Sequence, residues 1–223
     1  MAVEALIFDF DGLILDTETT RLQAWEEVFA EYGLSVSRVE WASLLGTSMD
    51  HPAPYEIIEK HIGEPIDRES IRTRCTQREL DLIQSEEVMP GVADLITAAR
   101  ARGLRLGVAS SSDRKWVSGH LKKLGLDTYF ESVRCADDVS RTKPSPDLYL
   151  AVLHDMGIQP DKAIAFEDSL HGVKAAKGAG IFCVAVPNNV TRHLPFPEAD
   201  LTVNSLSEMK LEGYIQMAQG EPQ

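Results

Sequence analysis

The sequence predicts an α/β fold, in which helices flank a parallel sheet and an all-helical domain is inserted after the first strand. Three observations favour this fold. A short apolar run from Ala5 to Phe8 lies close to the start of the sequence. No strand pattern follows between about residues 16 and 87. Beyond Met89-Pro90-Gly91, short apolar runs alternate with helical segments, which is typical of a parallel sheet covered by helices.

The insertion contains segments with the periodicity of amphipathic helices. In the first segment Leu22, Trp25 and Phe29 recur at helical spacing, and Gly33 ends the pattern. We expect this apolar stripe to face a core. Proline and glycine residues separate the segments from one another. The predicted helices span residues 18–32, 38–45, 55–62 and 68–83.

The remainder of the chain alternates between the two kinds of element. The expected strands span residues 104–110, 132–136, 163–166, 181–186 and 201–203, and the expected helices span residues 92–102, 113–124, 146–156 and 171–179. Because the first strand comes from the N-terminus, the chain divides into an α/β core of residues 1–15 and 89–223 and a helical domain of residues 16–88. We expect the two connections, near Asp16 and Glu87, to act as a hinge.

The composition excludes several classes of partner. With 43% hydrophobic and 26% charged residues, the 223-residue chain resembles an ordinary globular protein. Its formal net charge of -13 should repel nucleic acid and anionic membrane surfaces. We therefore expect no nucleic-acid or membrane partner, and an anionic substrate would need local basic groups or a metal ion.

The N-terminal segment and the cysteines favour a cytoplasmic protein. The start lacks a basic region, and Asp9 and Asp11 soon interrupt the apolar stretch, so a signal peptide is not expected. No apolar stretch is long enough to span a bilayer. Cys75, Cys135 and Cys183 are odd in number and far apart, which argues against a disulfide framework and a structural zinc site.

Two carboxylates directly follow the first strand. Asp9 and Asp11 are two residues apart, so in an extended chain they point to the same side, and Gly12 lets the backbone turn away. Two anions this close repel each other, and a bound divalent cation is the usual way to accommodate them. The alternative is a strand that simply runs into an Asp-Gly turn.

Polar side chains also follow two later strands. Ser110 and Ser111 end one predicted strand, and Glu167 and Asp168 end another. Ligands of open parallel sheets bind outside the carboxyl ends of the strands. The three strand ends, together with Lys143 in a loop before a helix, therefore predict one functional site.

These residues resemble a known family. The haloacid dehalogenase superfamily has a first motif similar to the run Asp9-Phe10-Asp11-Gly12-Leu13-Ile14-Leu15-Asp16-Thr17-Glu18. Ser110 resembles its second motif, Lys143 in Lys143-Pro144-Ser145-Pro146-Asp147 its third, and Glu167-Asp168-Ser169 its acidic fourth. The chain is similar to the β-phosphoglucomutase-like branch of phosphatases, whose members carry a helical cap. The resemblance implies a Rossmann-like core, a cap at residues 16–88, and Mg2+-dependent phosphoryl transfer.

The resemblance also implies roles for individual residues. Asp9 would attack phosphorus and become an aspartyl-phosphate, and Asp11 would act as general acid and base. Asp9, the main-chain carbonyl of Asp11, and Asp168 would bind Mg2+, with Glu167 behind them or as an occasional ligand. The phosphate would be held by Ser110, the amide of Ser111, and Lys143.

Simpler interpretations remain open for the phosphate-binding residues. Lys143 could be a solvated lysine at the start of a helix. The serines could belong to a helix cap, since Ser112 or Asp113 could begin the following helix.

The cap is expected to set substrate specificity. The candidates are Thr17 and Arg21 near the first connection, Thr47 in the run Gly46-Thr47-Ser48-Met49, and Arg72 in a basic helix that also carries Arg68, Arg74 and Arg78. The alternative for these arginines is a solvated face with i,i+4 ion pairs.

Two departures from β-phosphoglucomutase favour hydrolysis. That enzyme has a histidine where Arg21 stands. It also has a Gly-x-Ser-Arg pattern where this chain reads Gly46-Thr47-Ser48-Met49. A thioether offers neither a charge nor a strong donor for a second phosphate. We therefore expect a monomeric phosphatase that acts on a small phosphorylated metabolite, such as a sugar or polyol phosphate. The alternatives are a β-phosphoglucomutase-type mutase, with Arg21 or a cap arginine as the second-phosphate site, and a non-enzymatic binding or regulatory protein.

Overall fold

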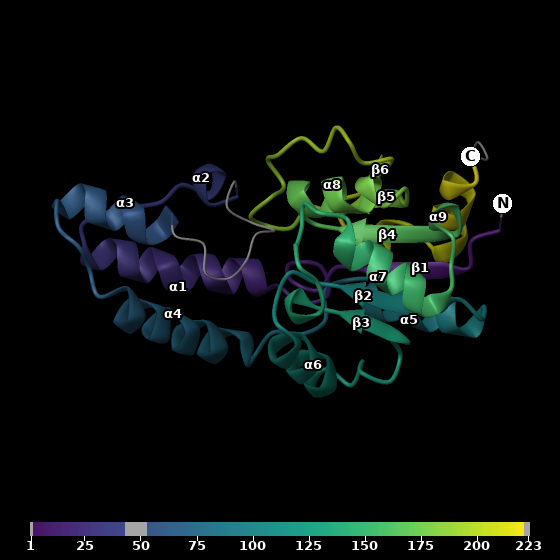
Figure 1. Cartoon of the computed structure of the whole chain (residues 1–223), viewed down its shortest axis with the longest axis horizontal. Helices are drawn as coiled ribbons and strands as arrows, with labels where there is room; N and C mark the ends of the chain where they lie inside the picture. Colours follow the sequence, from purple (N-terminus) through teal and green to yellow (C-terminus); the bar gives the residue numbers. More distant parts are fainter. Residues whose placement is uncertain (1, 43–52, 221–223) are drawn as a thin grey trace.

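A six-stranded sheet of order β3-β2-β1-β4-β5-β6 forms the centre of the computed structural model, which describes residues 2–42 and 53–220 (Figure 1). All neighbouring strands pair in parallel. The strands are β1 (Ala5–Phe8), β2 (Arg105–Ala109), β3 (Ser132–Arg134), β4 (Ala163–Glu167), β5 (Phe182–Ala185) and β6 (Leu201–Thr202). The predicted α/β class with a Rossmann-like parallel sheet is confirmed.

The helices agree closely with the sequence periodicity. They are α1 (Thr17–Glu31), α2 (Arg38–Ala42), α3 (Ala53–Ile62), α4 (Arg68–Ile83), α5 (Val92–Ala101), α6 (Arg114–Lys123), α7 (Asp147–Met156), α8 (Leu170–Gly178) and α9 (Leu211–Ala218). Short 3-10 helices lie at Ala136–Asp138, Pro160–Lys162 and Leu206–Glu208. These short helices and α9 were not predicted, and the end of the helix expected at residues 38–45 lies outside the described residues.

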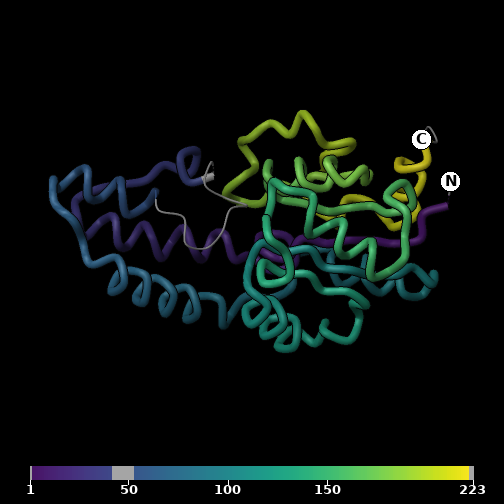
Figure 2. Tube along the Cα trace, in the orientation of Figure 1, coloured from purple at the N-terminus to yellow at the C-terminus, as the bar shows by residue number. Residues whose placement is uncertain are grey.

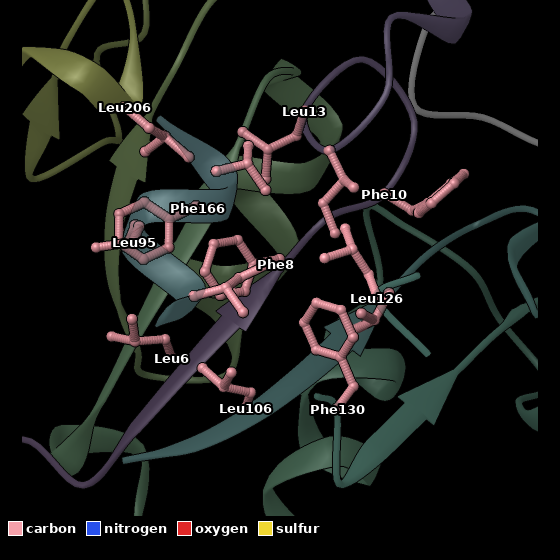
Figure 3. Packing of buried hydrophobic residues seen from close by; sticks show 14 of the residues in the cluster. Leu6, Phe8, Phe10, Leu13, Leu95, Leu106, Leu126, Phe130, Phe166 and Leu206 are labelled. Carbon is pink, nitrogen blue, oxygen red and sulfur yellow. The ribbon is translucent and has the colours of Figure 1, made fainter. Parts of the chain in front are cut away.

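Both faces of the sheet are covered, so the central strands are apolar without alternation. On one face Phe8 stacks on Phe166, with ring centroids 5.1 Å apart, under helices α5, α6 and α9 (Figure 3). On the other face Ile7 and Ala165 pack against α7 and α8. This double cover fixes the sheet and leaves its carboxyl edge to carry polar groups.

Helices α1 to α4 lie together at one end of the molecule, beyond the carboxyl edge of the sheet (Figure 2). Their buried cluster includes Trp25 and Phe29 from the predicted stripe of α1, Trp41 from α2, and Tyr55 from α3. Within the described residues, its buried members are distinct from those of the two clusters that flank the sheet. Val190, from the loop after β5, also packs into this cluster.

The chain passes between the sheet and the helices at two adjoining points. Leu15 forms an antiparallel bridge with Val88, and the amide of Met89 donates to the carbonyl of Ile14 at 2.9 Å. The two connections predicted near residues 16 and 87 therefore lie side by side. Nowhere in residues 2–42 and 53–220 is there a helix with the length and apolar character needed to cross a membrane.

A pair of glycine substitutions tests the packing of the sheet. A Cβ at Gly107 on β2 would lie 2.4 Å from Val152 Cγ1 on α7, whereas a Cβ at Gly119 on α6 meets open space. We expect Gly107→Ala to lower the free energy of unfolding by about 1–3 kcal/mol through overpacking. Gly119→Ala, measured in the same urea titration, should leave it unchanged or raise it by up to about 1 kcal/mol. Equal effects of the two changes would contradict this packing.

Candidate active site

The sheet order brings the predicted site residues to one edge. Because β1 lies between β2 and β4, Asp9 after β1 adjoins both Ser110 after β2 and Asp168 after β4. A small pocket opens there, and it is lined by six of the predicted residues, namely Asp9, Asp11, Arg21, Ser111, Lys143 and Asp168. Glu18 and Ser112 also line it, although the sequence analysis assigned neither of them to the site.

Lys143 is buried between two carboxylates. Its Nζ lies 2.8 Å from Asp9 Oδ1 and 2.6 Å from Glu167 Oε1, and only 3% of the residue is exposed. Tyr149 donates its hydroxyl to the same Glu167 oxygen. Burial by itself lowers the pKa of Lys143, but the charges of Asp9 and Glu167 raise it above its ordinary value. The alternative of a solvated surface lysine is therefore wrong.

The acidic residues are more numerous than the cations that face them. Oxygens of Asp9, Glu167 and Asp168 all lie within 4.8 Å of one another, and Lys143 supplies a single positive charge. Burial raises the pKa values of Asp9 and Asp168 well above their usual range, and the neighbouring carboxylates add to both shifts. Oxygen ligands suit a hard divalent cation. The donor set therefore fits a metal ion.

Asp168 is held by a residue from the loop after β5. Asn188 Nδ2 donates to Asp168 Oδ2 at 2.6 Å and to the carbonyl of Gly12 at 3.4 Å. The Asn188 Oδ1 atom accepts from the amides of Val190 and Thr191. Asn188 therefore ties the acidic group to the loop that carries Val190 into the cluster of α1 to α4.

The side chain of Asp11 turns toward the segment after β2. It accepts hydrogen bonds from Ser112 Oγ at 2.7 Å, Ser110 Oγ at 3.2 Å, and Trp116 Nε1 at 2.9 Å. Asp113 caps α6 by accepting from the Trp116 amide, so the helix has its cap without the serine hydroxyls. The Ser111 hydroxyl is buried, and no described residue hydrogen-bonds to it.

The candidates for substrate specificity lie in different surroundings. Arg21 lines the pocket between two carboxylates. Thr17 is fully buried, and its hydroxyl accepts from the Gly12 amide at 3.1 Å, so it supports the turn behind the pocket. Arg72 is exposed on α4, away from the pocket lining. Thr47 lies outside the described residues.

The other arginines of α4 pair between helices and not along one helix. Arg68 pairs with Glu59 of α3, and the partners of Arg74 and Arg78 are Glu31 and Glu27 of α1. The alternative of a solvated face with ion pairs is confirmed for these three partly exposed arginines, but the i,i+4 spacing is wrong, because the partners belong to neighbouring helices.

Four residues at the site were missed by the sequence analysis. Asn188 follows β5 closely, so the rule that polar groups gather at strand ends could have found it. The same rule could have found Ser112, which follows β2 as closely. Glu18 and Trp116 carry no comparable signal, because their contacts exist only once α1 and α6 are packed against the sheet edge.

The chain is similar to proteins of known family. Residues 6–186 match the model of the family described as haloacid dehalogenase-like hydrolase. The chain is 44% identical over 209 residues to a putative phosphatase, YhcW of Bacillus subtilis, which covers 94% of each protein. It is 35% identical over 181 residues to the fructose-1-phosphate phosphatase YqaB of Escherichia coli, 81% of this chain and 95% of that one.

A solved structure resembles the whole fold. CbbY from Rhodobacter sphaeroides, as a mutant in complex with xylulose-(1,5)bisphosphate, superposes with a TM-score of 0.76 at 32% identity. The match covers 95% of this chain and 98% of CbbY. The likeness therefore extends over both the sheet and the helical region.

A substitution at Gly12 tests whether the turn shapes the acidic site. Gly12 has a φ of 73°, and a Cβ there would lie 2.2 Å from Asp168 Oδ2 and 2.5 Å from Asn188 Nδ2. We expect Gly12→Ala to weaken Mn2+ binding about tenfold or more in calorimetry, since residues that orient metal ligands have effects of this size. Gly33→Ala is the matched control, because Gly33 has a φ of 69° and open space around it. Equal Mn2+ affinities in the two variants would contradict this role.

The buried carboxylates also predict how stability depends on pH. Burial raises the pKa of Glu18 from 4.5 to about 7. The folded state then binds this proton more tightly than the unfolded state, so stability falls as pH rises from about 4.5 to about 7. Without divalent cations, Glu18→Gln should remove up to about 3 kcal/mol of that fall in urea unfolding. An unchanged pH dependence in the variant would show that Glu18 is not the group responsible.

Proposed function

Since this chain belongs to the haloacid dehalogenase-like hydrolase family, we propose that it is a Mg2+-dependent phosphatase of small sugar or polyol phosphates. One observation carries the proposal: Lys143 is buried between Asp9 and Glu167, in the pocket that Asp168 also lines. A lysine with no role in catalysis would not need to be buried between two carboxylates. The named activities of similar proteins, a phosphatase for fructose 1-phosphate among them, support the substrate class.

Asp9 is proposed as the nucleophile. Its Oδ1 atom is held by the Phe10 amide at 2.6 Å and by Lys143, which leaves Oδ2 as the attacking atom. The bond from Asp9 to phosphorus forms as the bond from phosphorus to the ester oxygen breaks, and an aspartyl-phosphate results. The positive charge of Lys143 makes the approach of an anionic phosphate to Asp9 less unfavourable.

Asp11 is proposed as the general acid and base. It lines the same pocket and would protonate the departing alkoxide. It would then accept a proton from water as the water oxygen attacks phosphorus and frees Asp9. Its three hydrogen bonds to Ser110, Ser112 and Trp116 keep the carboxylate beside the pocket between these steps.

Two kinds of group are proposed to bind the phosphoryl oxygens. Lys143 supplies charge, and Ser110 with the amide of Ser111 supplies hydrogen-bond donors. A Mg2+ ion bound by Asp9, Asp168 and the carbonyl of Asp11 would neutralise charge on the phosphoryl group. The buried acidic group around Asp9 and Asp168 supports this choice of ligands.

The helices α1 to α4 are proposed to form a cap, residues 16–88, which covers the site and contacts the leaving group. Their separate buried cluster and the adjoining connections at Leu15 and Val88 support this division. The free, buried thiols of Cys75, Cys135 and Cys183 agree with the reducing cytoplasm that we propose as its location.

A hydrolysis assay tests the proposed function. We expect the protein to release phosphate from p-nitrophenyl phosphate with Mg2+, and to lose this activity in excess chelator. Asp9→Asn should lower kcat by about a thousandfold or more, because the nucleophile is removed. Asp127→Asn, at an exposed carboxylate after α6, is the matched control and should keep full activity.

Two results would contradict the proposal. Activity that persists in chelator or in Asp9→Asn would exclude the mechanism. With β-glucose 1-phosphate and a trace of its bisphosphate, glucose 6-phosphate that forms without free phosphate would identify a mutase instead.

A further inference from the structure

Three charged side chains from the cap helices form a buried group beside the pocket, which we call the Glu18–Arg21–Glu79 group. Arg21 Nη1 lies 3.4 Å from Glu18 Oε1, and Arg21 Nε donates to Glu79 Oε1 at 3.1 Å. Glu18 and Arg21 belong to α1, and Glu79 belongs to α4, which lies alongside it (Figures 1 and 2). The side chains of both glutamates are about 5% exposed.

The group carries more negative than positive charge when its carboxylates are ionised. One guanidinium faces two carboxylates, so the charge of Arg21 is already matched inside the protein. The buried Nη2 atom of Arg21 makes no hydrogen bond among the described residues, although it lies 3.1 Å from Glu79 Oε1. A second phosphate at Arg21 would nevertheless have to approach both carboxylates, so Arg21 is poorly placed to receive it, contrary to the alternative kept open from the sequence.

Glu18 lines the pocket and has an acceptor that the described residues leave unused. Its Oε2 atom is buried, and among the described residues no donor hydrogen-bonds to it. Glu18 lines the pocket together with Asp9 and Asp11. A buried carboxylate oxygen without a donor is unfavourable, so this position favours a ligand that brings one. Hydroxyl groups are suitable donors, whereas an ionised phosphate has none to spare and would be repelled.

We infer that Glu18 accepts hydrogen bonds from the hydroxyl groups of an uncharged leaving group, and that the Glu18–Arg21–Glu79 group excludes substrates with a second phosphate there. The inference rests on the proposed function and narrows its substrate class to polyhydroxylated monophosphates. In the sequence, residues 43–52 contain no lysine or arginine, and His51 is their one side chain that can carry a positive charge. In this respect the chain would differ from CbbY, which was captured with a bisphosphate.

A matched pair of substrates tests the inference on the unmodified enzyme. Fructose 1-phosphate and fructose 1,6-bisphosphate differ only by the second phosphate. We expect kcat/KM to be about tenfold or more higher for the monophosphate. The aryl ester p-nitrophenyl phosphate, which has no aliphatic hydroxyls, serves as the reference for the phosphoryl chemistry itself.

Substitutions then separate hydroxyl recognition from the chemistry. Glu18→Ala should lower kcat/KM for fructose 1-phosphate about 10–100-fold through lost charge-assisted hydrogen bonds. The loss of kcat/KM for p-nitrophenyl phosphate should be at least about tenfold smaller than the loss for fructose 1-phosphate. Glu27→Ala is the matched control, because Glu27 lies on the same helix in an exposed pair with Arg78. The double variant Glu18→Gln/Glu79→Gln frees Arg21, so it should raise the bisphosphate-to-monophosphate ratio about tenfold.

A binding measurement makes the result independent of turnover. Asp9→Asn, titrated calorimetrically with the two fructose phosphates, should bind the monophosphate more tightly. If the bisphosphate were bound at least as tightly as the monophosphate and hydrolysed at least as efficiently, the inference would be overturned. The proposed phosphatase function would not be affected by that result. The inference would also be overturned by a Glu18→Ala variant that loses both the aryl and the sugar substrate in equal proportion. Absence of any hydrolysis of p-nitrophenyl phosphate would instead overturn the proposed function, and the inference with it.

Discussion

The ion pairs of Lys143 with Asp9 and Glu167 are the interaction on which the site depends. They place one positive charge among three buried carboxylates, a number of anions that a protein interior tolerates only with partners. The remaining negative charge has to be met by a cation or by protons. We propose that a bound metal ion meets this charge, and that the metal would in turn allow an anionic phosphate to approach. The same charges therefore affect both the stability of the folded protein and the binding of a phosphate at the site.

The parallel sheet makes this arrangement possible. Since β1 lies between β2 and β4, residues that follow it lie beside those that follow β2 and β4, and helices cover both faces of the sheet. Helix α1 adds two charged side chains to the residues at this edge. Glu18 and Arg21 of α1 line the pocket together with Asp9 and Asp11, and Asn188 with Val190 joins the acidic group to the cluster of α1 to α4. We therefore propose that chemistry and selectivity come from different parts of the chain.

Much of the fold could be predicted from the sequence, because apolar runs and helical periodicity report directly on burial. Helix α4 has the predicted bounds, whereas α9 was missed: Gly213 lowers its helix propensity, and packing of Tyr214 on Phe166 compensates. At the site, strand ends pointed to Asp9, Ser110 and Asp168. The hydrogen-bond partners of Asp11 could not be predicted in this way, because Trp116, which donates to Asp11, is 105 residues away in the sequence.

We propose that Asp9 accepts the phosphoryl group, and mass spectrometry of the protein quenched in acid during turnover of fructose 1-phosphate tests this step most directly. We expect one added phosphoryl group on the peptide that contains Asp9, and its disappearance when Mg2+ is withheld. An active enzyme that shows no adduct under any quench time, or that carries the phosphoryl group on another peptide, would contradict it.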